Sequence, residues 1–364
     1  MVLTVTQSNW GGCYWRHTHV NLSNNNDIGG EMTAFKLPSK SAVYKQIRDV
    51  GISRATLNRV LPAWWDDALL QSNSGFLQFA KVLDQRLGLS VSVNDGNVSF
   101  LPAAYTVQFK KRAHIDIQQL SDATFLCQAV ANTLITVLEY NHCTPDLIRL
   151  QQSLDSLGEL TLANVLPIFW ACQIPVIHVS RFPTNIARPA GMVMRSNEHY
   201  AIVLGHKHKS PSTQLFVLLH ELGHIMCDHL TQDGSLTDSV LPELGESLEV
   251  ETDPQEDEAD AYALRLLRKE TDIVSMVKRL GRLSRPAELA IQAKRSSQAS
   301  GVSAGHFALT YGRETRDWIL TQQALRFLEK GNAIATLQFS CAEAMQQLDV
   351  RSEDSEYLMS MQSG

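Results

Sequence analysis

The sequence lacks the features of disulfide-rich secreted proteins, membrane proteins and strongly basic proteins. Its six cysteines are scattered, with no Cys-x-x-Cys pair, which argues against a disulfide framework or a cysteine zinc site and favours reduced thiols. No apolar run reaches the roughly 18 residues of a membrane-spanning helix. The formal net charge of −6 gives no cationic excess for nucleic acid. We find no charged start followed by an apolar segment, so we expect no signal peptide and a cytoplasmic protein.

What is present describes an ordinary globular chain. The 364 residues are 44% hydrophobic and 19% charged, and their number suffices for two or three domains. Apolar periodicity predicts an α+β, mostly helical fold. Residues 1–31 have little periodicity, and we expect a flexible leader or an upstream extension of a protein that begins at Met32. We then expect a small helical domain (32–110), connecting helices (111–160), a domain with a short sheet and an apolar helix (161–280), and a helical C-terminal region (281–364).

The stretch GISRATLNRVLP resembles a helix-turn-helix of the phage-repressor type. Apolar residues between Val43 and Val60 are spaced as two short helices around Gly51, and Pro62 ends the second helix. The predicted exposed face of the second helix carries Arg54, Thr56, Asn58 and Arg59. Such side chains suit phosphate and base-edge contacts, so DNA binding through residues 43–62 is one prediction. The alternative is a helical domain that holds a partner or is purely structural.

The stretch LFVLLHELGHIMCDHL is nearly all apolar, yet it contains His220, Glu221 and His224. On a helix, residues four apart lie on one face, so the two imidazoles can reach one metal ion. Glu221 is turned aside, close enough to act as a general base toward a water molecule. This is the His-Glu-x-x-His pattern of zinc hydrolases, and zinc would compensate for burying polar groups. The slim Gly223 lets another element approach the metal.

A catalytic zinc ion needs a third protein ligand and an open position. His229 follows His224 by five residues, and we interpret it as a solvated residue at the helix end. We predict Glu258 as the third ligand, because the helix EADAYALRLL has an apolar face that can pack beside the histidine helix. Glu256 and Asp257 are rivals in the same turn, although an acidic helix start is their simpler explanation. Asp228 and Asp260 are candidates for orienting the imidazoles from outside.

The apolar histidine helix, followed by an acidic loop and EADAYALRLL, resembles the ImmA/IrrE family of zinc metallopeptidases. The preceding IPVIHVS and GMVMRSNEHYAIVLG resemble the small sheet of that family, so the resemblance covers about residues 160–270. It implies a zincin-like metallopeptidase domain over 161–280, with zinc held by His220, His224 and Glu258, and with Glu221 as the catalytic residue. Two departures stand out: Arg268 occupies the place of a proline, and the acidic segment 241–257 is long.

The resemblance implies that the substrate is a helix-turn-helix repressor or an antitoxin. Its cleavage would relieve repression in a stress, mobile-element or toxin–antitoxin setting. Two alternatives stay open: a DNA-binding regulator with a structural or sensory zinc site, and a toxin that does not act by hydrolysis. Transition-state stabilisation usually needs a further His, Tyr or Arg. The sequence offers these candidates without choosing among them: His199, Tyr200, His206 and Tyr262.

Overall fold

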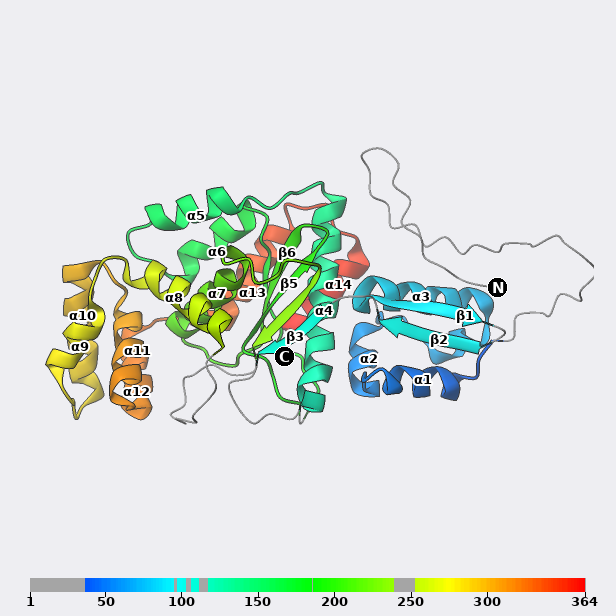
Figure 1. The fold of residues 1–364 in the computed structure, drawn as a ribbon, viewed down its shortest axis with the longest axis horizontal. Helices are drawn as coiled ribbons and strands as arrows, with labels where there is room; N and C mark the ends of the chain where they lie inside the picture. Colours follow the sequence, from blue (N-terminus) through cyan, green and yellow to red (C-terminus); the bar gives the residue numbers. More distant parts are fainter. Residues whose placement is uncertain are drawn as a thin grey trace, which may run out of the picture. The chain divides into compact units, whose positions relative to one another are not determined.

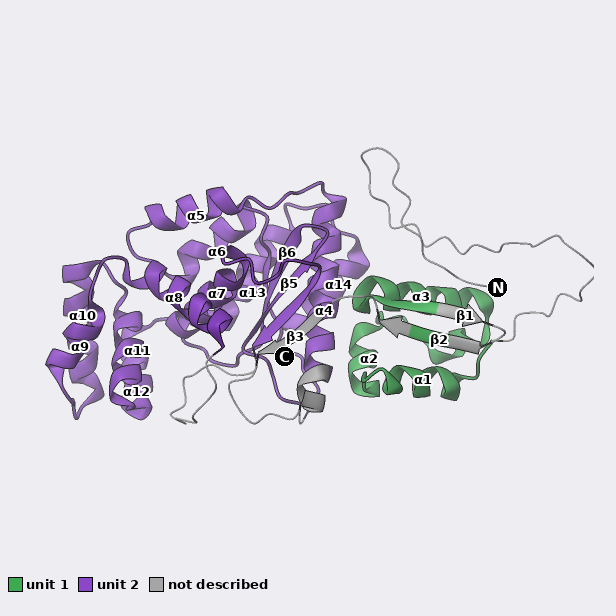
Figure 2. Ribbon diagram, viewed as in Figure 1, with its two compact units in different colours: residues 1–105 green, residues 106–364 purple. Residues whose placement is uncertain are grey.

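A computed structural model of the chain describes residues 37–94, 97–102, 106–110, 117–184, 186–238 and 253–363. Two compact units, residues 1–105 and 106–364, are coloured green and purple in Figure 2. The predicted leader and residues 239–252 of the acidic segment lie outside the described residues. The described residues are mostly helical with small sheets, which confirms the predicted α+β class.

The first unit contains helices followed by a β-hairpin (Figure 1). Its elements are α1 (Lys40–Asp49), α2 (Arg54–Val60), the 3-10 helix η1 (Asp67–Gln71), α3 (Asn73–Leu87), β1 (Leu89–Asn94) and β2 (Asn97–Pro102). Gly51 has a φ of 98°, which favours glycine, and it makes the predicted turn between α1 and α2. The hairpin differs from the expectation of helices alone up to residue 110. Its first strand alternates serine with β-branched valine, a pattern typical of strands.

Part of the face predicted to contact DNA makes contacts within this unit instead. The Arg54 guanidinium donates to both Asp67 carboxylate oxygens, at 2.9 and 2.8 Å, and it stacks 3.8 Å from the Tyr44 ring centre. This contact joins α2 to η1. Thr56 is fully buried, so its predicted exposure is wrong; it follows the helix-capping Ser53 and faces the core with Leu57. DNA binding through residues 43–62 stays a prediction.

The second unit is built around one five-stranded sheet. Its strands are β3 (Thr106–Lys110), β4 (Val176–His178), β5 (Gly191–Ser196), β6 (His199–Leu204) and β7 (Gly234–Asp238), in the order β3-β7-β5-β6-β4. β5 and β6 form an antiparallel hairpin within the predicted short sheet, and Asn197 and Glu198 make its turn with φ of 49° and 65°. β7 pairs with β5 on the other side, and Gly191 lies opposite Asp238. This pairing brings the end of β7 beside the start of β5.

Helices cover both faces of the sheet. The helices before and beside it are α4 (Ile117–Tyr140), α5 (Leu147–Ser156), α6 (Leu162–Ala171), α7 (Pro211–Met226) and α8 (Pro254–Arg268). Val193, Ile202 and Leu236 pack in one core with apolar residues of α6, α7 and α8. The alternate strand residues Met192 and Val203 are also buried, and α4 lies against β5 and β6 on that side (Figure 1). The sheet thus gives α7 a rigid support.

The C-terminal region is helical, as predicted. Its helices are α9 (Ile273–Leu280), α10 (Pro286–Ser300), α11 (Ala304–Thr315), α12 (Trp318–Leu328), α13 (Ala333–Met345) and α14 (Ser352–Gln362). The first four pack around their own apolar core, whereas α13 returns to β4 and α14 to α4. α11 also contacts α7. Among the described residues, no helix is both long and apolar enough to cross a membrane.

Candidate metal centre

The histidine helix α7 presents two imidazoles to one point. Ser210 caps its start, Pro211 occupies its first turn, and nearly every residue from Thr213 to Ile225 is buried. His220 and His224 are 5% and 0% exposed, and their Nε2 atoms lie 3.2 Å apart. The spacing of four residues therefore has the predicted effect of placing both rings on one face of the helix.

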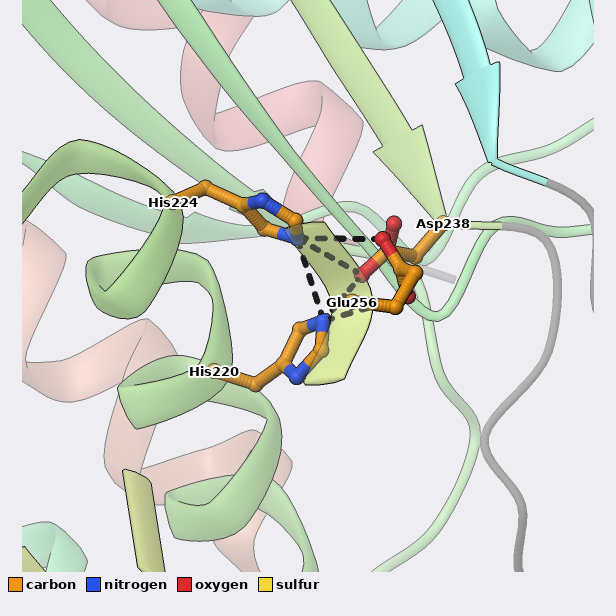
Figure 3. Close-up of side chains that lie close together, drawn as sticks. All are labelled: His220, His224, Asp238 and Glu256. Carbon is orange, nitrogen blue, oxygen red and sulfur yellow. Dashed lines mark hydrogen bonds and ion pairs between the residues drawn. The ribbon is translucent and has the colours of Figure 1, made fainter. Parts of the chain in front are cut away.

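Two carboxylates from other elements meet these imidazoles (Figure 3). Asp238, the last residue of β7, has its Oδ2 2.8 Å from His220 Nε2 and 3.7 Å from His224 Nε2. Glu256, in the first turn of α8, has one oxygen 3.6 Å from His220 Nε2 and the other 3.3 Å from His224 Nε2. All four residues are buried, and each offers a ligand atom within 4.8 Å of the others.

The structure does not bring Glu258 to the histidine pair, which corrects the sequence-based expectation. The Glu258 side chain is 62% exposed, and its Oε2 lies 3.0 Å from His229 Nε2. The reason is helical phase: Glu256 and Asp260 are four residues apart and share the face that packs on α7, while Glu258 is turned about 200° from Glu256. Asp257 is exposed as well, in keeping with its interpretation as a solvated residue of the first turn.

The other ring nitrogen of each histidine is also held. His220 Nδ1 lies 2.8 Å from Asp260 Oδ1, so Asp260 has the orienting position considered for it. His224 Nδ1 lies 2.7 Å from His229 Nδ1. His229 is only 7% exposed, so the expectation of a solvated histidine is wrong. Its backbone N–H donates to the carbonyl of His224, which folds the chain back beneath the helix end.

Gly223 allows α8 to approach α7 closely. A Cβ atom at this position would lie 2.8 Å from both the Cα and the carbonyl oxygen of Ala259. Backbone atoms cannot move aside as a flexible side chain can, so any larger residue would separate the helices. This confirms that the slim turn admits another element, and the element is the start of α8, which carries Glu256.

Glu221 lies beside the cluster in a fully buried position. Neither of its carboxylate oxygens has a hydrogen-bond partner of regular geometry among the described residues. Burial, followed by the nearby Asp238 carboxylate, raises the pKa of Glu221 well above its usual range. A Cβ on Gly191 would lie 2.0 Å from Glu221 Oε1, so the first residue of β5 makes the room that this carboxyl group occupies.

The residues fit a divalent cation. Hydrogen bonds from His220 and then His224 lower the pKa of Asp238 against the opposing effect of burial, and hydrogen bonds to the same two histidines lower that of Glu256. The bonds to Asp238, Asp260 and Glu256 in turn raise the pKa of His220 although burial opposes this. Two imidazoles and two carboxylates are the donors that zinc prefers. One Nε2 atom can accept a hydrogen bond from the other only if the other carries a proton, so the two atoms cannot both be acceptors. A cation bound by both lone pairs explains why they point at the same place.

The candidates for transition-state stabilisation are engaged elsewhere. His199 Nε2 lies 2.7 Å from the carbonyl oxygen of Cys143, and the Tyr262 hydroxyl donates to Gln151 on α5. The ring of His206 stacks on that of His208 at 5.9 Å between centres, and Tyr200 lies 6.0 Å from the Arg195 guanidinium. Among the described contacts of these four residues, none reaches the histidine pair.

Comparison with known families adds one finding. Residues 177–294 match the family model Peptidase_M78, described as the IrrE N-terminal-like domain. This range runs from β4 through the histidine helix and α8 to α10, so it contains all four clustered residues. No curated protein matches the chain. The match confirms the predicted family for this part of the chain: residues 177–294 belong to the ImmA/IrrE family of peptidases, M78.

Proposed function

We propose that this chain is a zinc-dependent peptidase whose zinc ligands are His220, His224 and Glu256. The observation that carries the proposal is the meeting of these three buried side chains beside the buried carboxyl group of Glu221. Membership of the M78 family supports peptide hydrolysis as the reaction. Asp260 and His229 would hold the two imidazoles with their Nε2 atoms toward the ion.

Bound zinc would supply the Lewis acid that polarises a peptide carbonyl and lowers the pKa of a coordinated water. Glu221 is then the residue that moves protons. Its carboxylate would accept a proton from the attacking water and deliver it to the leaving amine nitrogen. Effective transfer requires a pKa near the working pH. Burial raises the pKa of Glu221 above its usual range, and a nearby cation would favour the ionised form that accepts the proton.

Asp238 favours a second candidate function. Its Oδ2 lies close enough to His220 Nε2 for both atoms to bind one ion. With Asp238 as a fourth ligand the site would be closed, as structural zinc sites are, and the chain would be a regulator with a structural or sensory ion. In an open catalytic site, Asp238 would instead lie beside the fourth position.

The variant Asp238→Ala separates these two functions. A closed site predicts that zinc affinity falls more than about 100-fold, beyond the about 10–100-fold loss caused by removing an outer partner. An open site predicts a smaller loss, because Asp238 is then not a ligand of the ion. Zinc affinity can be measured by competition with a chromophoric chelator, and urea unfolding would verify that the variant folds.

For the substrate, we propose a cytoplasmic helix-turn-helix repressor or an antitoxin. Resemblance to the ImmA/IrrE family supports this choice. The test is co-expression with the product of a neighbouring repressor gene, combined with metal analysis of the purified chain. Fragments that appear with the wild type and not with Glu221→Gln would support hydrolysis. DNA binding or toxicity that persists in Glu221→Gln, without fragments, would favour the regulator or the non-hydrolytic toxin.

A further inference from the structure

A second group of metal-binding side chains lies beside the first. Cys227, His229 and Glu258 each offer a ligand atom within 4.8 Å of the other two. We call these three residues the thiol cluster. It combines a buried imidazole, a half-buried thiol and an exposed carboxylate, whereas the four residues of the candidate metal centre are all buried. The thiol cluster is therefore open to ions from solution.

Local backbone geometry brings the three side chains together. Cys227 caps the end of α7, and Asp228 has a left-handed φ of 56° that turns the chain sharply. The turn returns His229 to the helix end, where its Nε2 lies 3.0 Å from Glu258 Oε2. Glu258 stands on the side of α8 away from Glu256, so α8 supplies one carboxylate to each cluster. His229 is already fixed by His224, which reduces the entropy lost on binding an ion.

We propose that the thiol cluster binds a second divalent cation of the zinc and cadmium type. Thiolate, imidazole and carboxylate are the three protein ligands that such ions take, and water would complete the coordination. The Cys227 thiol releases its proton to solvent when the ion binds, because the thiolate is the ligand. The Nε2 lone pair of His229 and one oxygen of Glu258 provide the other two bonds.

The two sites oppose each other through the contact between His224 and His229. When His224 binds an ion through Nε2, its proton is on Nδ1 and is donated to His229 Nδ1. His229 then carries its own proton on Nε2 and donates it to Glu258. An ion on His229 Nε2 requires that proton on Nδ1 instead, where two N–H groups would face each other across 2.7 Å. The rings would have to separate, and His224 would lose its orienting partner.

Occupation of the thiol cluster should therefore weaken the first site, and by linkage the reverse should hold equally. Loss of an orienting partner typically reduces metal affinity about 10–100-fold. Excess zinc would then inhibit the peptidase through Cys227. The antagonism rests on the proposed function, whereas cation binding by the thiol cluster does not.

Cadmium binding to the chelator-treated full chain tests the site directly. The expected result is a thiolate-to-cadmium charge-transfer band that saturates once both clusters have taken up an ion, near two equivalents, and that disappears in Cys227→Ser. Cys143→Ser is the matched control, because this thiol is also half-buried but contacts the carbonyl of Asn141 instead. Glu258→Gln, an exposed change that should preserve folding, should weaken cadmium binding. Absence of the band from the wild type, or its persistence in Cys227→Ser, would overturn the proposal.

The same band tests the antagonism without any activity measurement. Cadmium should bind the thiol cluster at least about tenfold more tightly in zinc-free His220→Asn than in the zinc-loaded wild type. If His220→Asn fails to fold by circular dichroism, Glu256→Gln replaces it. Equal cadmium affinities would refute the antagonism. A normal band in a chain that cleaves no substrate would refute the proposed function and support the thiol cluster.

Discussion

Gly191→Ala should displace the proposed general base while leaving the metal ligands in place. A Cβ at Gly191 would lie 2.0, 2.6 and 2.8 Å from Oε1, Cδ and Cγ of Glu221. Ordinary contact begins at 3.4 Å, so the Glu221 oxygen must move by about 1.4 Å. The strand cannot retreat instead, because residue 191 pairs with Leu204 on β6 and with Asp238 on β7.

This displacement of Glu221 should lower both the activity and the stability of the protein. A misplacement of about 1 Å reduces the rate about 100-fold, so we expect a loss of at least that size in kcat/KM. Overpacking of a buried site typically costs about 1–3 kcal/mol in the free energy of unfolding. Zinc affinity should stay within about threefold of the wild type, since the three atoms nearest to the added Cβ all belong to Glu221 and none to His220, His224 or Glu256.

The assays are substrate cleavage, urea unfolding and chelator competition. Gly158→Ala is the control, because a Cβ there has no atom within 4 Å. The double variant Gly191→Ala/Glu221→Ala should lose less stability than the two single changes predict together, since the clashing carboxyl group is gone. Wild-type activity in Gly191→Ala, or additive stability losses in the double variant, would refute the reasoning.

Three further predictions test the surroundings of the centre. Gly223→Ala should push Ala259 and α8 away from α7. We expect zinc affinity to fall about tenfold or more and the free energy of unfolding to fall by about 1–3 kcal/mol. Unchanged values in chelator competition and urea unfolding would contradict this prediction. Asp260→Asn should reduce zinc affinity about 10–100-fold by releasing His220, and retention of the full affinity would exclude an orienting role. Burial, with Arg268 and Arg313, lowers the pKa of His306 from 6.5 to about 3, so only the unfolded chain gains this proton between those values. The contribution of neutral His306 to the free energy of unfolding is complete above pH 6.5 and falls by about 1.4 kcal/mol per pH unit below that value. His306→Leu should remove this loss of stability between about pH 7.5 and 5.5. An unchanged pH dependence of unfolding in the variant would refute the prediction.

The features that depend on short-range periodicity could be predicted from the sequence. The four-residue spacing of His220 and His224 fixes their common face, whatever the rest of the chain does. The hairpin over residues 191–205 carries its own turn signal. The slim Gly223 also predicted a close neighbour, because the steric reason is local.

The third ligand required knowledge of helical phase. The apolar face predicted for EADAYALRLL includes Ala259 and Ala263, and both are buried. Counting back three residues from Ala259 on that face leads to Glu256, so the signal was present. Glu258, the first residue of EADAYALRLL, lies off that face and is exposed.

Asp238 and His229 could not be found in this way. Asp238 reaches the cluster because β7 pairs with β5, a contact between residues far apart in sequence. His229 is directed inward by the left-handed turn at Asp228, which a spacing rule for continuous helices does not anticipate.

The most direct test of the account is the zinc affinity of Glu256→Gln, compared with Glu258→Gln and with Asp257→Asn as the exposed control. We predict a loss of more than about 100-fold for Glu256→Gln, about tenfold for Glu258→Gln through His229, and no change for Asp257→Asn. Wild-type affinity in Glu256→Gln, or a larger loss in Glu258→Gln, would contradict the proposed ligand set.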